Sequence, residues 1–255
     1  MHAQVSTTRL SVNLNKVALL RNARTIGIPS VLRAAELSIG AGAQGITVHP
    51  RPDQRHIRPA DVHDLAAYLR DFPAVEFNIE GNPFAGLLEL VRAVRPHQCT
   101  LVPDSVDAAT SDHGWNLETD GGRLAPAVAE LRQLGIRVSV FMDVGSDQWN
   151  LARELGADRV ELYTQPFAEA HARGRSGPAL AQAAMAARMA QMAGLGVNAG
   201  HDLNLQNLGE FCTIPGILEV SIGHALIADA IEVGLPAAVR AYLAILKTSA
   251  VHGAA

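Results

Sequence analysis

The sequence predicts an α/β fold, a (β/α)8 barrel formed by a single domain over residues 1–255. Three observations favour this fold class. Short apolar runs rich in β-branched residues alternate with helical patterns, about eight such βα units fill the chain, and glycines stand where a helix gives way to the next strand. A chain of 255 residues also suits one barrel of this kind.

The strands are expected where the apolar runs are shortest and most β-branched. Strands of a parallel sheet are buried on both faces, so they should be near-continuous apolar runs, and most of these segments fit that description. The expected strands are residues 10–14, 45–49, 75–79, 99–103, 136–142, 159–163, 197–199 and 217–222.

Helical patterns lie between the strands. The clearest of them cover residues 83–94, 124–134, 147–155 and 178–193. Four glycines separate a helix from the strand that follows, and a left-handed residue is expected at each of them: Gly42, Gly135, Gly156 and Gly196. Two connections, residues 104–122 and 165–177, are expected to be long loops of the kind that form lids or binding loops.

An open doubly wound sheet is the alternative fold. It is disfavoured because the glycine-rich dinucleotide fingerprint is absent after the first strand. No Pro- or Ser-rich linker divides the chain, which supports one domain.

Composition narrows the class of protein. A hydrophobic content of 48% argues against global disorder, and a net charge of −4 with a pI near 6.2 argues against a general nucleic-acid binder. The two cysteines, Cys99 and Cys212, lie outside any metal-type spacing and indicate a reduced, cytoplasmic protein. Neither the polar first nine residues nor the interrupted apolar stretch 180–195 predicts a signal peptide or a membrane span.

Polar and titratable residues gather where the expected strands end. The chemistry of a (β/α)8 barrel is found at the carboxyl ends of its strands, so these residues are candidates for an active site. In chain order they are Asn13, Asn15, Lys16, His49, Arg51, Asn78, Glu80, Thr110, Asp143, Glu161, His201, Asp202, Gly223 and His224.

Each candidate also has a structural interpretation. A single strand-end histidine is more often a hydrogen-bonded structural group than a catalyst. Glu80 could help to cap the helix that begins near residue 83, and Asp143 is expected to cap the helix near residue 147. Glu161 could pair with Arg159 or Arg175. The joint pattern favours function more than any single residue does.

Two regions have the chemistry of phosphate sites. The segments 221–225 and 198–201 run from strand to loop or helix through glycine, so backbone N–H groups could bind an anion there, although ordinary strand-to-helix punctuation is an equal alternative. A basic cluster could hold a second phosphate. The alternative is that it is an ordinary basic surface exposed to solvent. The cluster comprises Lys16, Arg21, Arg24, Arg51, Arg55 and His56.

Several motifs together resemble the pyridoxine 5′-phosphate synthase family. They include VNLNK at 12–16, LRNAR at 20–24, GITVHPR at 45–51, RHI at 55–57, NIE at 78–80, LVP at 101–103, VNAGH at 197–201 and IGHA at 222–225. The resemblance extends from about residue 10 to the last helix, and the motifs around His49 to His56 and Asn198 to His201 are the most specific.

The resemblance implies a (β/α)8 barrel with extra helices that assembles from dimers into a homo-octamer in the cytoplasm. It implies a transferase of vitamin B6 biosynthesis that condenses 3-amino-2-oxopropyl phosphate with 1-deoxy-D-xylulose 5-phosphate. The products are pyridoxine 5′-phosphate, inorganic phosphate and water. The family uses no metal and no organic cofactor, and neither nucleic acid nor membrane is an expected partner.

The resemblance also implies roles for individual residues. His49 and Glu80 would accept protons, His201 would donate one, and Glu161 would stabilise a transition state or charged intermediate. The aminoketone phosphate would be held by Asn13, Arg24, Asp202, Gly223 and His224. The deoxyxylulose phosphate would be held by Asn15, Lys16, Arg51, His56 and Thr110, with the loop after the fourth strand closing as a lid.

The sequence departs from the commonest family pattern in three places. Asn15-Lys16 replaces the Asp-His of many members, Asp202 replaces the glycine of some, and a few extra residues precede Glu80. The side-chain charge of Asp202 would be unfavourable beside a phosphate unless the side chain points away.

Two other functions compete with this one. A different phosphosugar barrel, an isomerase or aldolase, is the rival enzyme, but a Schiff-base aldolase needs a lysine at a strand end and the chain has only Lys16 and Lys247. A catalytically inactive phosphate-binding barrel is the non-enzyme alternative, and the presence of His49, Glu80 and His201 argues against it.

Overall fold

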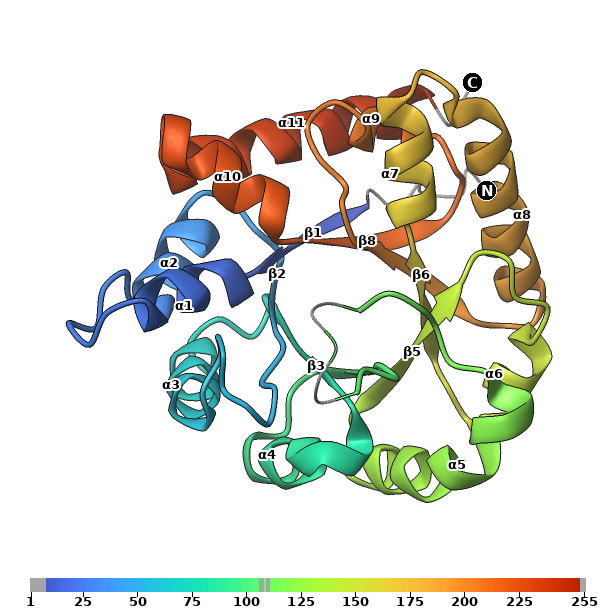
Figure 1. Cartoon of the computed structure of the whole chain (residues 1–255), viewed down its shortest axis with the longest axis horizontal. Coiled ribbons are helices and arrows are strands. Elements are labelled where there is room, and N and C mark those ends of the chain that lie inside the picture. The colour runs from blue at the N-terminus through green and yellow to red at the C-terminus, as the bar shows by residue number, and fades with distance from the viewer. Residues whose placement is uncertain (1–7, 106–107, 109–110, 253–255) are drawn as a thin grey trace.

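The computed structural model describes residues 8–105, 108 and 111–252, and the side chains of residues 8–249 within those ranges. Its eight strands form a closed parallel barrel in which each pairs with the next and β8 pairs with β1. Figure 1 shows the strands at the centre with the helices outside them. The strands are β1 (Arg9–Asn13), β2 (Gly45–Val48), β3 (Glu76–Gly81), β4 (Gln98–Leu101), β5 (Arg137–Asp143), β6 (Arg159–Tyr163), β7 (Gly196–Gly200) and β8 (Ile217–Ile222). The predicted (β/α)8 barrel is confirmed.

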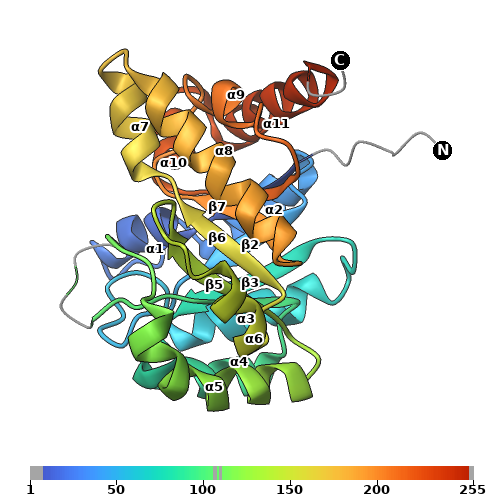
Figure 2. The same cartoon turned by 90° about the vertical axis from the view of Figure 1, so that its right-hand side faces the viewer.

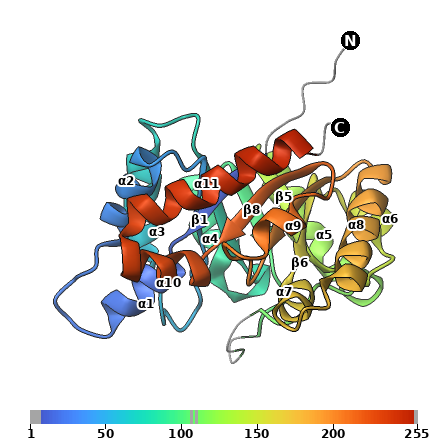
Figure 3. The ribbon, with the colours of Figure 1, turned by 90° about the horizontal axis from the view of Figure 1, so that it is seen from above.

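The helices form a layer around the barrel, which Figure 2 shows from the side. They are α1 (Asn15–Asn22), α2 (Val31–Gly40), α3 (Pro59–Leu69), α4 (Leu88–Val94), α5 (Leu117–Gln133), α6 (Trp149–Leu155), α7 (Gln165–Ala172), α8 (Ser176–Met192), α9 (Leu208–Phe211), α10 (His224–Val233) and α11 (Leu235–His252). A short irregular turn, η1 (Pro83–Leu87), precedes α4. Helix α11 packs against α2, α9 and β1 (Figure 3).

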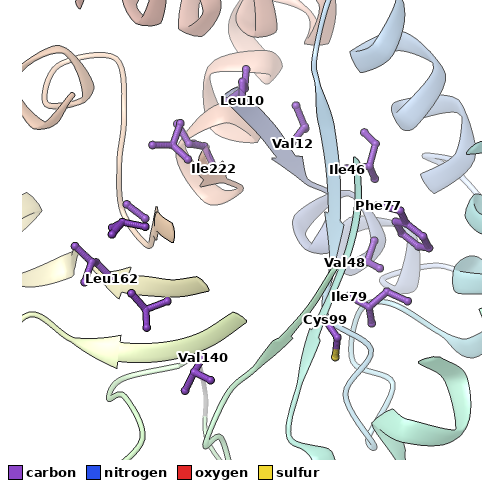
Figure 4. Packing of buried hydrophobic residues seen from close by; sticks show 14 of the residues in the cluster. Leu10, Val12, Ile46, Val48, Phe77, Ile79, Cys99, Val140, Leu162 and Ile222 are labelled. Atoms are coloured by element: carbon purple, nitrogen blue, oxygen red, sulfur yellow. The ribbon is translucent and has the colours of Figure 1, made fainter. Parts of the chain in front are cut away.

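The apolar core lies between the strands and the helices rather than inside the barrel. Alternate strand residues such as Val12, Ile46, Ile79 and Leu162 are fully buried there (Figure 4). The residues between them point into the barrel, where their side chains bond to one another. The Ser11 and Thr47 hydroxyls are 2.7 Å apart, for example.

The strands are therefore not the near-continuous apolar runs that the sequence analysis expected. In the segment RLSVN of β1, or EFNIEG of β3, apolar and polar residues alternate. Successive residues of a strand point to opposite faces, so one half of each strand packs against helices and the other half lines the barrel. This interior is polar because it includes the floor of the cavity described below.

The boundaries of three other predicted segments also differ from the structure. Residues 165–177 are not a long loop, because α7 begins at Gln165 directly after β6. The loop after β4 ends at residue 116, since Asn116 caps α5 by accepting a hydrogen bond from the Glu118 backbone N–H. The helical pattern 83–94 is interrupted by non-helical backbone at Ala85 and Gly86.

Three of the four predicted left-handed glycines have positive φ, namely Gly42, Gly135 and Gly156. The fourth prediction was wrong: Gly196 is the first residue of β7, and Gly194, with φ +81°, is the left-handed residue after α8. Within the described part of the chain, no helix combines the length and apolar character that crossing a membrane requires.

Candidate active site

A cavity of about 640 Å3 opens at the carboxyl ends of the strands. Residues from the ends of all eight strands and the loops that follow them line it. Among the predicted site residues, the lining includes Asn13, Asn15, Lys16, His49, Arg51, His56, Glu80, Glu161, His201, Asp202, Gly223 and His224. The barrel thus brings all four predicted catalytic residues to one cavity, and all but two of the predicted substrate-binding residues.

His49 is fixed at the end of β2 by two asparagines. The Asn13 Oδ1 atom accepts a hydrogen bond of 3.0 Å from the Asn15 backbone N–H, and Asn15 Oδ1 accepts one of 2.8 Å from the His49 backbone N–H. An amide oxygen accepts such a hydrogen bond as a carboxylate oxygen does. Asn15 can therefore hold the His49 backbone as the aspartate of other family members could. The bonds join the start of α1 to the ends of β1 and β2.

The imidazole of His49 is held in its neutral form. Burial lowers the pKa of His49 to about 3, and the positive charges of Arg51 and Arg55 contribute in the same direction. Burial, with His49 and Arg51 nearby, likewise lowers the pKa of His56 to about 3. A neutral imidazole has a free lone pair, so His49 is in the proton-accepting form at neutral pH, although its low pKa makes it a weaker base than an exposed histidine.

Glu80, at the end of β3, has few hydrogen-bond donors near its carboxyl group. The amide nitrogens of Asn13 and Asn78 each lie 3.5 Å from one of its two oxygens. Burial, followed by the nearby carboxylates of Glu161 and Asp104, raises the pKa of Glu80 well above its usual range. Glu80 is not a helix cap, because Asn82 takes that role by accepting a hydrogen bond of 2.9 Å from the Phe84 backbone N–H.

Glu161 on β6 is a second buried carboxyl group in the cavity. Burial raises its pKa to about 7. Its side chain lies against Gly200 on β7, where a Cβ atom would collide with Glu161 Oε1. It forms no ion pair with Arg159, which instead donates a 3.2 Å hydrogen bond to Asn198 Oδ1 and lies 3.8 Å from Glu76. Arg175 is exposed just before α8.

His201 and Asp202 form the turn after β7. The His201 ring packs edge-on against Tyr163, with ring centroids 5.1 Å apart, and its Nδ1 atom is 3.3 Å from Asp202 Oδ2. The side chain of Asp202 therefore points toward the imidazole.

One side of the cavity is formed by the start of α10. Gly223 is the N-cap residue, so the first free N–H groups of the helix lie at the cavity wall. The Cβ of any other residue at 223 would lie 3.1 Å from Asn13 Cβ. This arrangement can bind an anion through backbone N–H groups.

A second part of the lining is cationic, and Arg51 is its centre. The buried guanidinium donates hydrogen bonds of 2.8 Å to Asp104 Oδ2, 2.8 Å to the Ser105 carbonyl and 2.7 Å to the Ala108 carbonyl. Arg51 thereby fixes the loop after β4 over the cavity. Lys16 and His56 line the same side.

Three residues that the sequence analysis singled out lie elsewhere or have other roles, and a fourth is outside the described residues. Arg24 is exposed after α1 and does not line the cavity, and Thr110 lies outside the described residues. Arg21 is structural, because it pairs with Asp61 and donates to the His56 carbonyl. Asp143 does not cap α6; its Oδ1 atom accepts a 3.0 Å hydrogen bond from the Gly114 backbone N–H.

The cavity also contains residues that were not predicted. Asp104, Ser111, Phe141 and Gln165 line it. Below it, Glu219 of β8 is almost completely buried, and its pKa is raised to about 8 by burial and by Glu76, although Arg159 opposes the shift. The alternation of polar residues in β8 was the signal that could have identified Glu219 as a barrel-facing residue. No cluster of three or more metal-ligating side chains occurs among the described residues.

Comparisons with known proteins show which proteins this chain resembles. A family model described as pyridoxal phosphate biosynthesis protein PdxJ matches residues 10–248. The chain is 56% identical over 256 residues to a protein of Xanthomonas campestris pv. campestris named pyridoxine 5′-phosphate synthase, covering 97% of this chain and all of the relative. A protein of the same name from Albidiferax ferrireducens is 56% identical over 243 residues, covering 93% of this chain and 96% of the relative.

Solved structures with low sequence identity share the fold. The 3-keto-L-gulonate-6-phosphate decarboxylase of Vibrio cholerae has a TM-score of 0.65 at 10% identity, covering 96% of this chain and 98% of that one. The phosphoribosyl anthranilate isomerase of Thermus thermophilus has a TM-score of 0.56 at 14% identity, covering 94% and 99%. At such identities the likeness concerns the barrel alone.

Proposed function

The chain belongs to the family of the pyridoxal phosphate biosynthesis protein PdxJ, the pyridoxine 5′-phosphate synthases of vitamin B6 biosynthesis, and on that premise we propose its reaction. The enzyme acts as a transferase that condenses 3-amino-2-oxopropyl phosphate with 1-deoxy-D-xylulose 5-phosphate. Pyridoxine 5′-phosphate, inorganic phosphate and water are the products. One observation carries this proposal: four titratable residues from four strands face a single cavity that has an anion-binding wall on either side.

The cavity suits a reaction that consists mainly of proton transfers. An amine must condense with a ketone, water and phosphate must leave, and a carbon–carbon bond must close the ring. Each step needs a group that gives or takes a proton near neutral pH. The neutral imidazole of His49 supports a role as proton acceptor. The raised pKa of Glu80 makes its carboxylate, once ionised, a stronger base than an exposed one.

The remaining two groups have complementary tasks. His201 gives a proton to a departing oxygen, and its Nδ1 contact with Asp202 leaves the other ring nitrogen for the cavity. Glu161 sits beside Gly200 and stabilises positive charge that develops on the condensed amine. The pKa of Glu161, raised to about 7, makes this stabilisation sensitive to pH near neutrality.

Two walls of the cavity are suited to two phosphates. The N-terminus of α10, with Asn13, Gly223 and His224, takes the aminoketone phosphate. The backbone N–H of Asp202 assists them, while the side chain of Asp202 points toward His201. Lys16, Arg51 and His56, with Asn15 for a hydroxyl group, take the deoxyxylulose phosphate. We propose that Arg24 also binds the aminoketone phosphate and that Thr110 also binds the deoxyxylulose phosphate. Replacing each residue by alanine and measuring the binding of each substrate separately would test these two roles.

A turnover assay tests the proposed reaction. Purified protein is incubated with both substrates, and pyridoxine 5′-phosphate is followed by its absorbance while released phosphate is measured in parallel. We expect equal amounts of the two products and none when either substrate is left out. Absence of product with both substrates present would refute the proposal. Borohydride trapping of a substrate on Lys16, the one lysine of the cavity lining, would support the aldolase instead.

We also propose that the chain forms a homo-oligomer, an octamer built from dimers. Large apolar side chains are exposed in three places, and a partner subunit would remove them from water. They are Leu20, Ile26 and Ile28 near α1, Met185, Met189 and Met192 on α8, and Ile231 and Val233 at the end of α10. Sedimentation velocity over a range of concentrations would contradict the proposal if only the mass of one chain were observed.

A further inference from the structure

Two consecutive residues after β7 have a backbone conformation that side chains disfavour. His201 has φ +89° and Asp202 has φ +60°. Residues other than glycine seldom adopt positive φ, because the Cβ atom crowds the carbonyl oxygen. Such strain persists where surrounding contacts impose it, and it is found most often at functional sites.

Neighbouring side chains hold this turn in place. The Thr164 backbone N–H donates a 3.0 Å hydrogen bond to the Gly200 carbonyl, and the Thr164 hydroxyl contacts the carbonyl oxygens of both Gly200 and His201. On the other side, Asn207 Nδ2 donates a 3.2 Å hydrogen bond to the Asp202 carbonyl. The turn is thus clamped before and after the histidine.

The strained turn brings the Asp202 carboxylate to the imidazole of His201. Asp202 Oδ2 is 3.3 Å from Nδ1 of His201, whose ring is held from the side by Tyr163. Interaction with His201 is the largest cause of the lowered pKa of Asp202, and His224 and Lys16 contribute at longer range. The carboxylate is therefore ionised at neutral pH.

Other charged groups face the same region. Glu161 on β6 and Lys16 at the start of α1 line the cavity with His201. His224, at the start of α10, also lines the cavity. Behind the histidine, burial raises the pKa of Tyr163 to about 12, and the charges of Asp202, Asp112, Asp143 and Glu169 act in the same direction. Asp202 forms an ion pair with His201, with Oδ2 of the carboxylate 3.3 Å from Nδ1 of the imidazole.

From this arrangement we propose that Asp202 is a positioning residue for His201. Its carboxylate accepts the proton of Nδ1, which directs Nε2 into the cavity as the proton donor and favours the charged imidazole before the transfer. Glycine would fit the backbone of residue 202 without strain, but it could not do this. The proposal rests on the proposed function, because it requires His201 to donate a proton in the reaction.

Two substitutions separate the charge of Asp202 from its hydrogen bond. Asp202→Asn keeps the shape and an accepting oxygen, and asparagine tolerates positive φ, but the negative charge is lost. Asp202→Gly removes both the charge and the acceptor while relieving backbone strain. Asp147→Asn, at an exposed position before α6, is the matched control for removal of one surface charge.

We expect the basic limb of the kcat–pH profile to move to lower pH by about half a unit in both variants of Asp202, as loss of a half-exposed ion pair would produce. Turnover should fall by about 3- to 10-fold, more for glycine than for asparagine, with KM for both substrates almost unchanged. Nitrogen-15 spectra of His201, assigned by comparison with His201→Asn, should show that the Nδ1–H tautomer predominates in the wild type and in Asp202→Asn but not in Asp202→Gly.

These experiments distinguish failure of the role proposed for Asp202 from failure of the proposed reaction. No product from the wild type, or full turnover by His201→Asn, would refute the reaction or the donor role whatever Asp202 does. If His201→Asn is inactive while both Asp202 variants keep the wild-type pH limb and tautomer, Asp202 does not position His201. A raised KM for one phosphorylated substrate with an unmoved limb would overturn the proposal too, because Asp202 would then act on substrate. Melting temperatures should show that Asp202→Gly remains at least as stable as the wild type.

Discussion

Glu80 illustrates how neighbours determine what one side chain can do. Its carboxyl group has two weak amide donors at 3.5 Å and three carboxylates in its surroundings, so the charged form is poorly stabilised. A carboxylate in this condition takes up a proton readily, which is the property required of a base. An exposed glutamate such as Glu89 on α4 lacks this environment.

Glu80→Gln should abolish most of the turnover without unfolding the barrel. Glutamine keeps the shape and can still accept hydrogen bonds, but it cannot take up a proton. Loss of a general base costs about 10²–10⁴ in rate, which single-turnover kinetics would measure. Glu89→Gln is the control and should keep the wild-type rate, and circular dichroism should be alike for both. Near-wild-type turnover of Glu80→Gln at saturating substrate would show that Glu80 is not the base.

The convergence of the site residues on one cavity was predictable from the sequence, but their hydrogen-bond partners were not. Polar residues at strand ends indicated His49, Glu80 and His201, because the ends of parallel strands meet at one mouth. Asp143 was misassigned because its partner, Gly114, lies in a loop whose path no local pattern specifies. The pairing of Arg51 with Asp104, 53 residues apart, has no local signal either.

At the scale of whole elements, the number and type of the strands followed from the sequence, while α7 did not. The segment after β6 contains Gly, Pro and Arg and was interpreted as a loop, yet Gln165–Ala172 is helical. Pro166 stands in the first turn, where proline is favoured rather than disruptive, and Phe167 is buried against Phe211. Packing with a distant element thus outweighed the local pattern.

The loop after β4 is anchored to β5 through a glycine, and this gives a stability prediction. A Cβ atom on Gly114 would lie 2.6 Å from Met142 Cα, so Gly114→Ala requires backbone movement. We expect it to lower the free energy of unfolding by about 1–3 kcal/mol in chemical denaturation. Gly121→Ala is the matched control: it lies within α5 with open space around it, and it should stabilise the protein by about 0.5–1 kcal/mol. Equal effects of the two would contradict the close contact.

Arg51 and Asp104 connect the loop after β2 to the loop after β4, and a double-mutant cycle measures that connection. Arg51→Ala should cost about 3–5 kcal/mol of stability, because it leaves the Asp104 carboxylate buried without its partner. It should also weaken deoxyxylulose phosphate binding by about 1.5–3 kcal/mol and leave aminoketone phosphate binding nearly unchanged. Arg51→Ala/Asp104→Ala should be more stable than Arg51→Ala alone. Additive losses in stability would refute the coupling between Arg51 and Asp104. Equal losses in the binding of both substrates would refute the assignment of Arg51 to the deoxyxylulose phosphate site.

Considered as a whole, the molecule has a polar barrel interior with ionised groups at its lower end. Glu76 pairs with Arg137 and lies 3.8 Å from Arg159, and Glu219 lies beside them. Glu219 also contributes to the raised pKa of Glu80 at the mouth. Charge at the floor of the barrel is thus linked to charge in the cavity.

Glu219 should make the stability of the whole barrel depend on pH. Its pKa of about 8 in the folded state exceeds its usual value of 4.5, so the folded chain holds a proton that the unfolded chain releases. The stabilising contribution of the buried, protonated Glu219 carboxyl group is fully present below pH 4.5 and is lost as the pH rises through about 8. The stability of Glu219→Gln relative to the wild type should therefore increase by about 1–3 kcal/mol between pH 6 and pH 9. Glu154→Gln, on the surface of α6, is the control, and a pH-independent difference for Glu219→Gln would contradict the raised pKa.

The alternation of residues along each strand also has a consequence for how such a barrel can evolve. The half that faces the helices needs only apolar side chains of suitable volume, so Val12, Ile46 or Leu162 could be exchanged for similar residues at small cost. The inward half can diverge independently and acquire new chemistry without disturbing that core. A library that randomises only inward positions should therefore retain many folded members while sampling new activities.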